Sequence, residues 1–204
     1  MFSNDSTHIV WARVRNGMIS VWNGGEEILF KHAYGRIVGI SYKMDEWNGT
    51  EFERVLVHLV HDDERWILSM RTDSQYFRTM CNYLVTAGAQ GVLYESLRFA
   101  PTMNEKAGKK YSALYISHGD KFLHAYYRTG KPFGINDKHI AGLPDPNTIE
   151  IGGRTVYDFT PQVEFYKAFL SRHFSPGWGD SEAKPTPADA FTAAPLEDPD
   201  DLHF

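Results

Sequence analysis

The chain has 204 residues, 42% of them hydrophobic and 14% aromatic, and a formal net charge of −5. The single cysteine, Cys81, excludes an internal disulfide and a cysteine-based zinc site, and it agrees with a reducing compartment. No run approaches the roughly 20 apolar residues of a membrane span, and the first residues lack the basic and apolar regions of a signal peptide. We therefore expect a soluble cytosolic protein with no membrane partner.

Short strands joined by tight turns are predicted over the first 71 residues. The strand at 51–61 has the clearest alternation, because Val55, Val57 and Leu59 share one face. Trp47 lies in the polar loop before it, where a tryptophan either covers a small satellite core or offers its ring to a ligand. Asn16-Gly17 is a hairpin-turn signal. The predicted strands are 8–15, 18–22, 28–31, 35–44, 51–61 and 65–70.

The apolar period changes from two residues to about 3.6 after Asp73. Tyr76 to Leu84 have helical spacing, with Asp73 or Ser74 as the N-cap and Gly88 at the stop. Residues 129–157 are predicted to be irregular, apart from a short hairpin around 149–154. Further strands are expected at 91–99, 111–118 and 121–128, with a polar loop at 101–110 and a second helix over 161–173.

From Ser175 onward the composition becomes that of a disordered, acidic tail. Residues 175–204 contain seven acidic residues and one lysine, a net charge of −6, which leaves +1 on the predicted domain at 1–174. A Pro- and Ala-rich linker at 175–196 has too little apolar surface to fold. The acidic tip at 197–204, Glu-Asp-Pro-Asp-Asp-Leu-His-Phe, suits a basic pocket with an apolar floor, in a partner or on its own domain.

This tip resembles the acidic C-terminal tip of bacterial and phage single-stranded DNA-binding proteins. The match is an acidic run, an apolar residue and a final phenylalanine, although His203 stands where that family usually has proline. The resemblance implies a protein of DNA replication, recombination or repair in a bacterial or phage-infected cell. It also implies that replication or repair proteins bind the tip through Asp198, Asp200, Asp201, Leu202 and Phe204. A solubilising tail without a docking role is the alternative.

The order of the predicted elements favours a mostly β fold. Three strands, a helix and two strands over 35–128 match the oligonucleotide-binding (OB) arrangement of a five-stranded barrel. We therefore expect an OB-fold-like antiparallel β-barrel with a mid-chain helix and a disordered acidic tail. The strands at 8–31 would be an N-terminal addition, and the helix at 161–173 an extra C-terminal one.

Residues 98–138 form the electropositive part of the chain, with eight Lys or Arg residues against three acids. Aromatic residues alternate with these cations. A single-strand binding surface needs this combination, because cations contact phosphates and aromatic rings stack on bases of any identity. A sheet with buried aromatics and solvated lysines would have the same composition. The candidates in this segment are Arg98, Lys106, Lys109, Lys110, Tyr111, Tyr126, Arg128 and Lys131.

The second and third strands of the predicted barrel would supply most of its binding face. Arg65, Trp66 and Arg71 are the candidates there, together with Trp47 in the preceding loop. Trp66 has charged residues on one side and Ile67 on the other. The pattern is therefore compatible with a core tryptophan and with a stacking platform.

These observations predict a sequence-independent single-stranded DNA-binding protein that is not an enzyme and uses no cofactor or metal. A protein-interaction or structural β domain with a solubilising tail is the alternative. A third hypothesis is a small metal-dependent nuclease or hydrolase using the region from His58 to Asp63, but His58 and His61 would face opposite sides of a strand. The sequence leaves open homo-oligomer formation and the preference between DNA and RNA.

Overall fold

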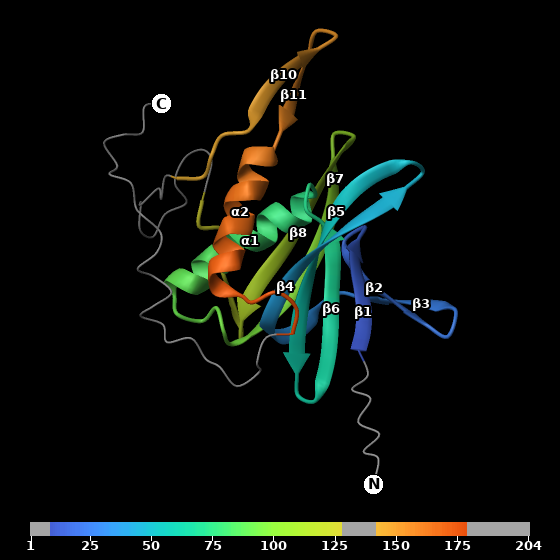
Figure 1. The fold of residues 1–204 in the computed structure, drawn as a ribbon, viewed down its shortest axis with the longest axis vertical. Helices are drawn as coiled ribbons and strands as arrows, with labels where there is room; N and C mark the ends of the chain where they lie inside the picture. The colour runs from blue at the N-terminus through green and yellow to red at the C-terminus, as the bar shows by residue number, and fades with distance from the viewer. Residues whose placement is uncertain (1–8, 128–141, 179–204) are drawn as a thin grey trace.

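The computed structural model describes residues 9–127 and 142–178, and strands predominate among them, as predicted. Nine strands form one mixed sheet in the order β3-β2-β1-β6-β5-β4-β7-β8-β9. Two helices pack beside it, and a separate hairpin of β10 and β11 projects beyond them (Figure 1). The strands of the large sheet are β1 Ile9–Arg15, β2 Met18–Asn23, β3 Glu26–Phe30, β4 Ala33–Trp47, β5 Thr50–His61, β6 Glu64–Arg71, β7 Ser96–Lys106, β8 Lys109–His118 and β9 Lys121–Phe122. The other elements are α1 Gln75–Ala89, β10 Asn147–Ile151, β11 Arg154–Asp158 and α2 Thr160–His173.

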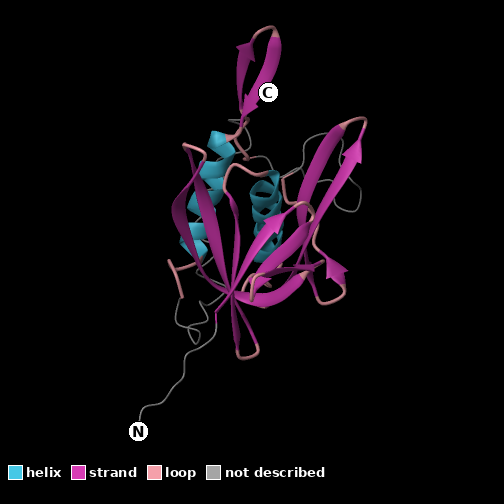
Figure 2. Ribbon diagram, turned by 90° about the vertical axis from the view of Figure 1, so that its right-hand side faces the viewer, coloured by secondary structure: helices cyan, strands magenta, loops and turns pink. Residues whose placement is uncertain are grey.

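The sheet bends around the helices, so that strands lie on both sides of α1 and α2 in Figure 2. Val55, Val57 and Leu59 of β5 are fully buried on the helix side, as their alternation predicts. The turn between β1 and β2 reaches across this core to β7 and α1. There Gly17 donates its N–H to the hydroxyl of Tyr76 at 2.7 Å, and a Cβ on Gly17 would lie 2.7 Å from the backbone nitrogen of Met103.

Helix α1 begins where the sequence indicates, and its side chains cover the outer edge of strand β8. The Ser74 hydroxyl caps it by accepting the N–H of Phe77 at 3.2 Å. The N–H groups of Ser112 and Leu114 on β8 donate to the side chains of Gln75 and Thr79, at 3.1 and 2.9 Å. Side chains of α1 therefore stand where a further strand would pair with β8.

The predicted order of three strands, a helix and two strands is present as β4-β5-β6-α1-β7-β8, but the sheet is not closed into a barrel. In the predicted barrel, the last strand would pair with the third. Instead β1 pairs with β6 in parallel, from Ile9 opposite Arg65 to Arg13 opposite Ser69. The N-terminal hairpin thus occupies the free edge of β6, and the sheet is mixed rather than antiparallel.

The segment from 91 to 128 differs from the prediction. Strand β7 starts at Ser96 and runs through the expected loop to a turn at Ala107-Gly108, and β9 has only two residues. Pro101 is tolerated in β7 because its partner Leu114 donates its N–H away from β7, to Thr79. Pro101 and Leu114 are therefore a non-hydrogen-bonded pair, in which the missing N–H of proline breaks no ladder bond.

The chain after α2 packs against the sheet rather than leaving it at Ser175. Phe174 is buried, and the carbonyl of Ser175 accepts the N–H of Ile40 at 3.0 Å. Gly39 lies so close to this segment that a Cβ there would be 1.6 Å from the carbonyl oxygen of Gly177. This contact places the half-buried Trp178 on the sheet face turned away from the helices. Residues 179–204, with most of the predicted tail, lie outside the described residues.

Candidate nucleic-acid interface

Basic side chains gather on the sheet face turned away from the helices. Because Val55 and Val57 point toward the core, the residue before them, Arg54, points outward by strand alternation. The strand registers place six other cations of β1, β4 and β6 on the same face as Arg54. We call this surface the arginine face; its basic residues are Arg13 and Arg15 on β1, Arg36 and Lys43 on β4, Arg54 on β5, and Arg65 and Arg71 on β6.

Three of these cations stand side by side across neighbouring strands. Lys43 pairs with Arg54, and Arg54 pairs with Arg71. Like charges directly opposite one another destabilise a sheet. Both arginines contact the ring of Phe52, with the guanidinium carbons of Arg54 and Arg71 lying 5.0 and 4.7 Å from its centroid. The arrangement presents two guanidinium groups and an aromatic ring in one place.

Carboxylates at the margins of this face partly neutralise its cations. Asp45 accepts a hydrogen bond from Arg54 at 2.8 Å, Asp73 bonds Arg71, and Glu27 bonds Arg15. The bond to Asp73 raises the pKa of Arg71, and the bond from Ser20 lowers that of Glu27. The pair of Arg71 and Asp73 is solvent-exposed, and such pairs are worth about 0–1 kcal/mol, so a phosphate can replace this carboxylate at little cost. The Arg54 side chain is only 19% exposed.

Trp178 lies on the same face, over the strands β5 and β6. Its ring meets that of His58 edge to face at 4.8 Å, and the guanidinium carbon of Arg65 is 5.2 Å from its centroid. His58 is buried beneath it, with Nε2 at 2.9 Å from the hydroxyl of Ser41. Burial lowers the pKa of His58, so this ring adds no positive charge near neutral pH.

The structure places Arg65 and Arg71 on the arginine face, but it puts Trp66 on the opposite side of β6. Trp66 packs against the core and meets Phe30 edge to face at 6.3 Å. Strand alternation explains this correction, since neighbouring residues point to opposite faces. Trp66 is therefore a core residue rather than a stacking platform. Trp47 is 71% exposed, at the tip of the β4–β5 hairpin.

The predicted lysine loop is the tip of the β7–β8 hairpin. Lys106 pairs with Lys109, and Tyr111 is two residues farther along the same face of β8. Lys110 points to the opposite face, opposite Glu105. All four side chains at 106 and 109–111 are exposed. Figure 1 shows the β7–β8 and β4–β5 hairpins extending toward the same end of the molecule, so these residues and Trp47 lie at one end of the sheet.

The remaining predicted residues are partly buried or lie outside the described residues. Arg98 lies on the outward face of β7, opposite Tyr34, but it is half-buried and donates to His32 Nδ1 at 3.3 Å. Tyr126 packs against the core and Tyr127, with ring centroids 5.1 Å apart, and burial raises its pKa. Its prediction as a base-stacking residue is therefore corrected, because its ring is used in packing. Outside the described residues lie Arg128, Lys131, Asp198, Asp200, Asp201, Leu202 and Phe204.

Several residues of the arginine face were missed by the sequence analysis, which concentrated on the basic segment at 98–138. Trp11, Arg13 and Arg15 alternate along β1, so a signal for one polar and aromatic face was present. The position of Trp178 carried no such local signal, because it depends on the contact between Gly39 and Gly177.

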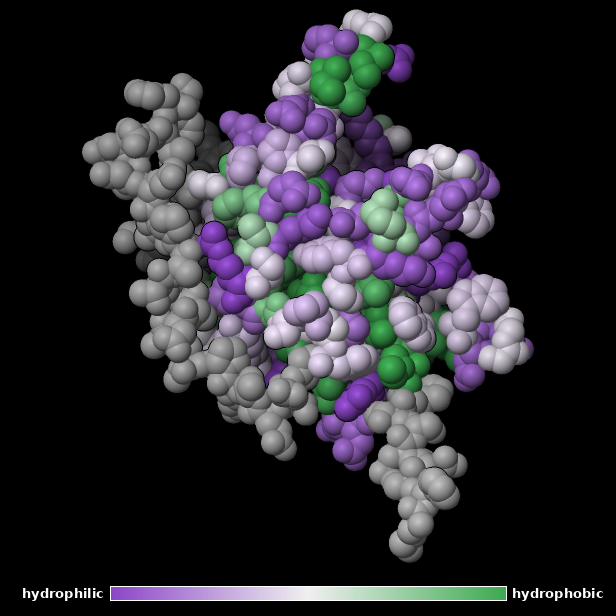
Figure 3. Space-filling view, in the orientation of Figure 1, coloured by the Kyte–Doolittle hydropathy of each residue, from purple (hydrophilic) through white to green (hydrophobic). Residues whose placement is uncertain are grey.

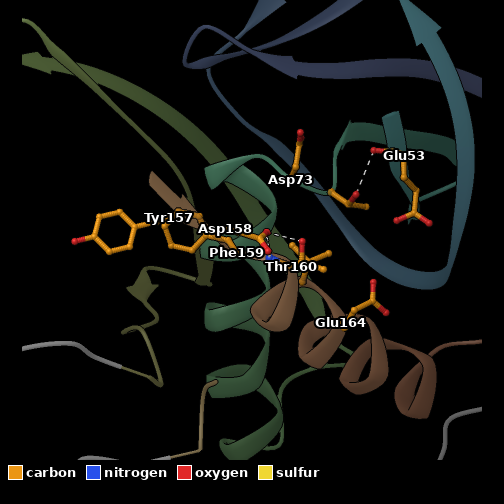
Figure 4. A pocket seen from close by; sticks show the side chains of 9 residues that line it. Glu53, Asp73, Tyr157, Asp158, Phe159, Thr160 and Glu164 are labelled. Atoms are coloured by element: carbon orange, nitrogen blue, oxygen red, sulfur yellow. Dashed lines mark hydrogen bonds between the residues drawn. The ribbon is translucent and has the colours of Figure 1, made fainter. Parts of the chain in front are cut away.

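A pocket at the other side of the sheet has the wrong charge for a phosphate. Its cavity volume is about 360 Å³, and it lies between the start of α2 and the end of β6, as the labelled residues in Figure 4 show. Its acidic lining residues are Glu53, Asp73, Asp158 and Glu164. Within residues 9–127 and 142–178, no group of three or more His, Cys, Asp or Glu side chains could hold a metal ion. In the described part of the chain, no helix is long and apolar enough to cross a membrane.

Comparison with known proteins gives no relative: no family model, no curated protein and no solved structure matches this chain.

Proposed function

We propose that this protein binds single-stranded DNA without sequence preference, through the arginine face, in DNA replication, recombination or repair. The observation that carries the proposal is the row of Lys43, Arg54 and Arg71 across three strands, with both arginines against the ring of Phe52. Exposed cations contact phosphates and release counterions, while aromatic faces stack on bases. This pairing of groups favours an unpaired strand over a duplex, whose bases are already stacked.

The strand arrangement also supports an OB-like site. Strand β4 pairs with both β5 and β7, and α1 follows β6, as in an OB barrel, although β1 takes the place of the closing strand. In OB domains the second and third strands carry the ligand, flanked by the loops after the first and fourth strands. The equivalents here are β5 and β6 with Arg54, Arg65 and Arg71, and the hairpin tips with Trp47 and Lys106.

The proposal predicts that polythymidine quenches the tryptophan fluorescence of the full chain and that salt weakens the binding. Several tryptophans lie on or near the arginine face, and phosphate contacts make affinity fall steeply with salt. The measurement is a fluorescence titration at low and high salt, with a duplex of the same length as the control. Absence of any response to the single strand, both in the full chain and in a chain ending at Trp178, would contradict the proposal.

The acidic tip is proposed to recruit replication or repair proteins and to compete with DNA for the arginine face. Removing residues 197–204 is expected to leave polythymidine binding equal or tighter, because four side-chain carboxylates are lost. The same truncation should abolish capture of those partner proteins by the immobilised chain. A truncated chain that binds DNA more weakly would argue against competition by the tip.

A protein-interaction domain is the second candidate, favoured by the exposed apolar side of the β10–β11 hairpin. Ile149 pairs with Val156, and Ile151 lies two residues along the same face. The hairpin forms the apolar patch at the top of Figure 3. An isolated two-stranded hairpin is marginally stable in water, so a partner that covered this side would stabilise it. Binding of polythymidine that is insensitive to salt, or absent, would favour this candidate.

A further inference from the structure

We propose that Trp178, Trp11 and Trp22 form a row of stacking platforms for the bases of an unpaired strand, running across the arginine face from β5 to β2. The inference rests on the proposed function and goes beyond it by assigning the bases to particular residues and a direction. Neither Trp11 nor Trp22 lies in the OB-like part of the sheet, since both belong to the N-terminal hairpin.

The strand registers place the three rings in line. His58, which lies under Trp178, pairs with Ile67, and Ile67 pairs with Trp11. Ala12 pairs with Val21, so the next step of the same antiparallel register sets Trp11 opposite Trp22. The row therefore crosses β5, β6, β1 and β2 at a right angle to the strands. Three inter-strand spacings of about 4.8 Å make it roughly 14 Å long.

Trp11 and Trp22 are unusually open to solvent for residues of an inner and a next-to-edge strand. Trp11 is 57% exposed and Trp22 is 61% exposed. Large aromatic rings side by side on a surface generally mark a binding site, because each leaves a large apolar area in contact with water.

The charges beside the row decide what kind of ligand it fits. Arg13 lies on one side of Trp11, opposite Ser69 and Ser20, and Arg65 lies on the other side, opposite Ile9. Glu27 stands opposite Trp22, but it is bonded to Ser20 and Arg15, which offset its charge. Rings flanked by cations on both sides match the bases and phosphates of a single strand. A protein partner with an apolar surface would instead leave these arginines beside a neutral contact.

The test is replacement of Trp11 and Trp22 by alanine in the full chain, with binding of dye-labelled polythymidine followed by anisotropy over a range of salt. We expect the double variant to bind about 30-fold or more weakly. Each lost ring removes the stacking of one base, which is worth about fivefold or more in affinity. The salt dependence should keep its slope, because no phosphate contact is lost. The Trp11→Phe, Trp22→Phe chain should retain most of the affinity.

A matched control is Tyr157→Ala on the β10–β11 hairpin, which removes an aromatic ring of similar exposure, 57%, away from the arginine face. This variant should bind as tightly as the unchanged chain. Suppose that the alanine double variant keeps a normal thermal midpoint and binds within about twofold of the unchanged chain. That result would contradict the stacking role of the row, and it would leave the proposed function unaffected. If the unchanged chain itself binds no single strand, the proposed function fails, and the exposed row is then a surface for a protein.

Discussion

Replacing Arg54 and Arg71 together with glutamate is expected to weaken polythymidine binding about 100-fold at roughly 0.15 M salt. On a single strand, each lost phosphate contact lowers the slope of log K against log salt by about 0.7. At this salt concentration, that loss weakens the affinity about fourfold. Reversing the charge adds repulsion between the new carboxylates and the phosphates. The two residues are neighbours across β5 and β6, so both act on the same part of the strand.

The measurement is anisotropy with labelled polythymidine over a range of salt, using the Arg54→Gln, Arg71→Gln chain to separate lost contacts from repulsion. The glutamine variant should lower the salt slope by about 1.4. Reversal of Lys121 and Arg154, which lie on β9 and β11 away from the arginine face, changes the net charge equally and is the matched control. Equal weakening by this control would mean that overall charge, rather than the arginine face, governs binding.

The substitution Gly39→Ala is expected to destabilise the full chain by about 1–3 kcal/mol, the usual cost of overpacking. The new Cβ would be 1.6 Å from the carbonyl oxygen of Gly177, so the segment that carries Trp178 must move away from β4. The bond from Ile40 N–H to the Ser175 carbonyl would be lost with it. For a chain of this size the thermal midpoint should fall by roughly 2–12 °C, measured by circular dichroism.

A double-mutant cycle isolates this contact. In a chain ending at Phe174, the same Gly39→Ala change should be neutral or slightly stabilising, because the three atoms nearest the methyl group, which belong to Ser175 and Gly177, are absent and alanine loses less backbone entropy than glycine. An equal loss of stability in the long and the short chain would show that the strain arises elsewhere, and that residues 175–178 are not held at Gly39.

The elements with strong local signals could be predicted from the sequence. Asn16-Gly17 forms the turn between β1 and β2, Ser74 caps α1, and the alternation of β5 predicted its buried face. These features depend on residues close together in the chain, where turn chemistry, capping and periodicity act directly. The second helix and the hairpin near 149–154 were predicted for the same reason.

The features that were missed depend on residues far apart in sequence. Nothing local indicates that β1 pairs in parallel with β6, which leaves the sheet open where a closed barrel was expected. The same pairing decides the site, since it brings Trp11 and Arg13 beside Arg65. The two candidate roles of Trp66 could be separated only when the covered face of β6 was known. The anchoring of Trp178 depends equally on a distant glycine.

The side chains of α1 that bond to β8 also limit how copies of this protein can associate. Gln75 and Thr79 satisfy the outward N–H groups of Ser112 and Leu114, and β9 covers the next part of the same strand. At the other end of the large sheet, β3 has one unpaired side. A strand of a second copy can therefore pair with β3, whereas the side chains of α1 block strand addition at Ser112 and Leu114 of β8. Pairing through β3 would be symmetrical and would stop at two copies.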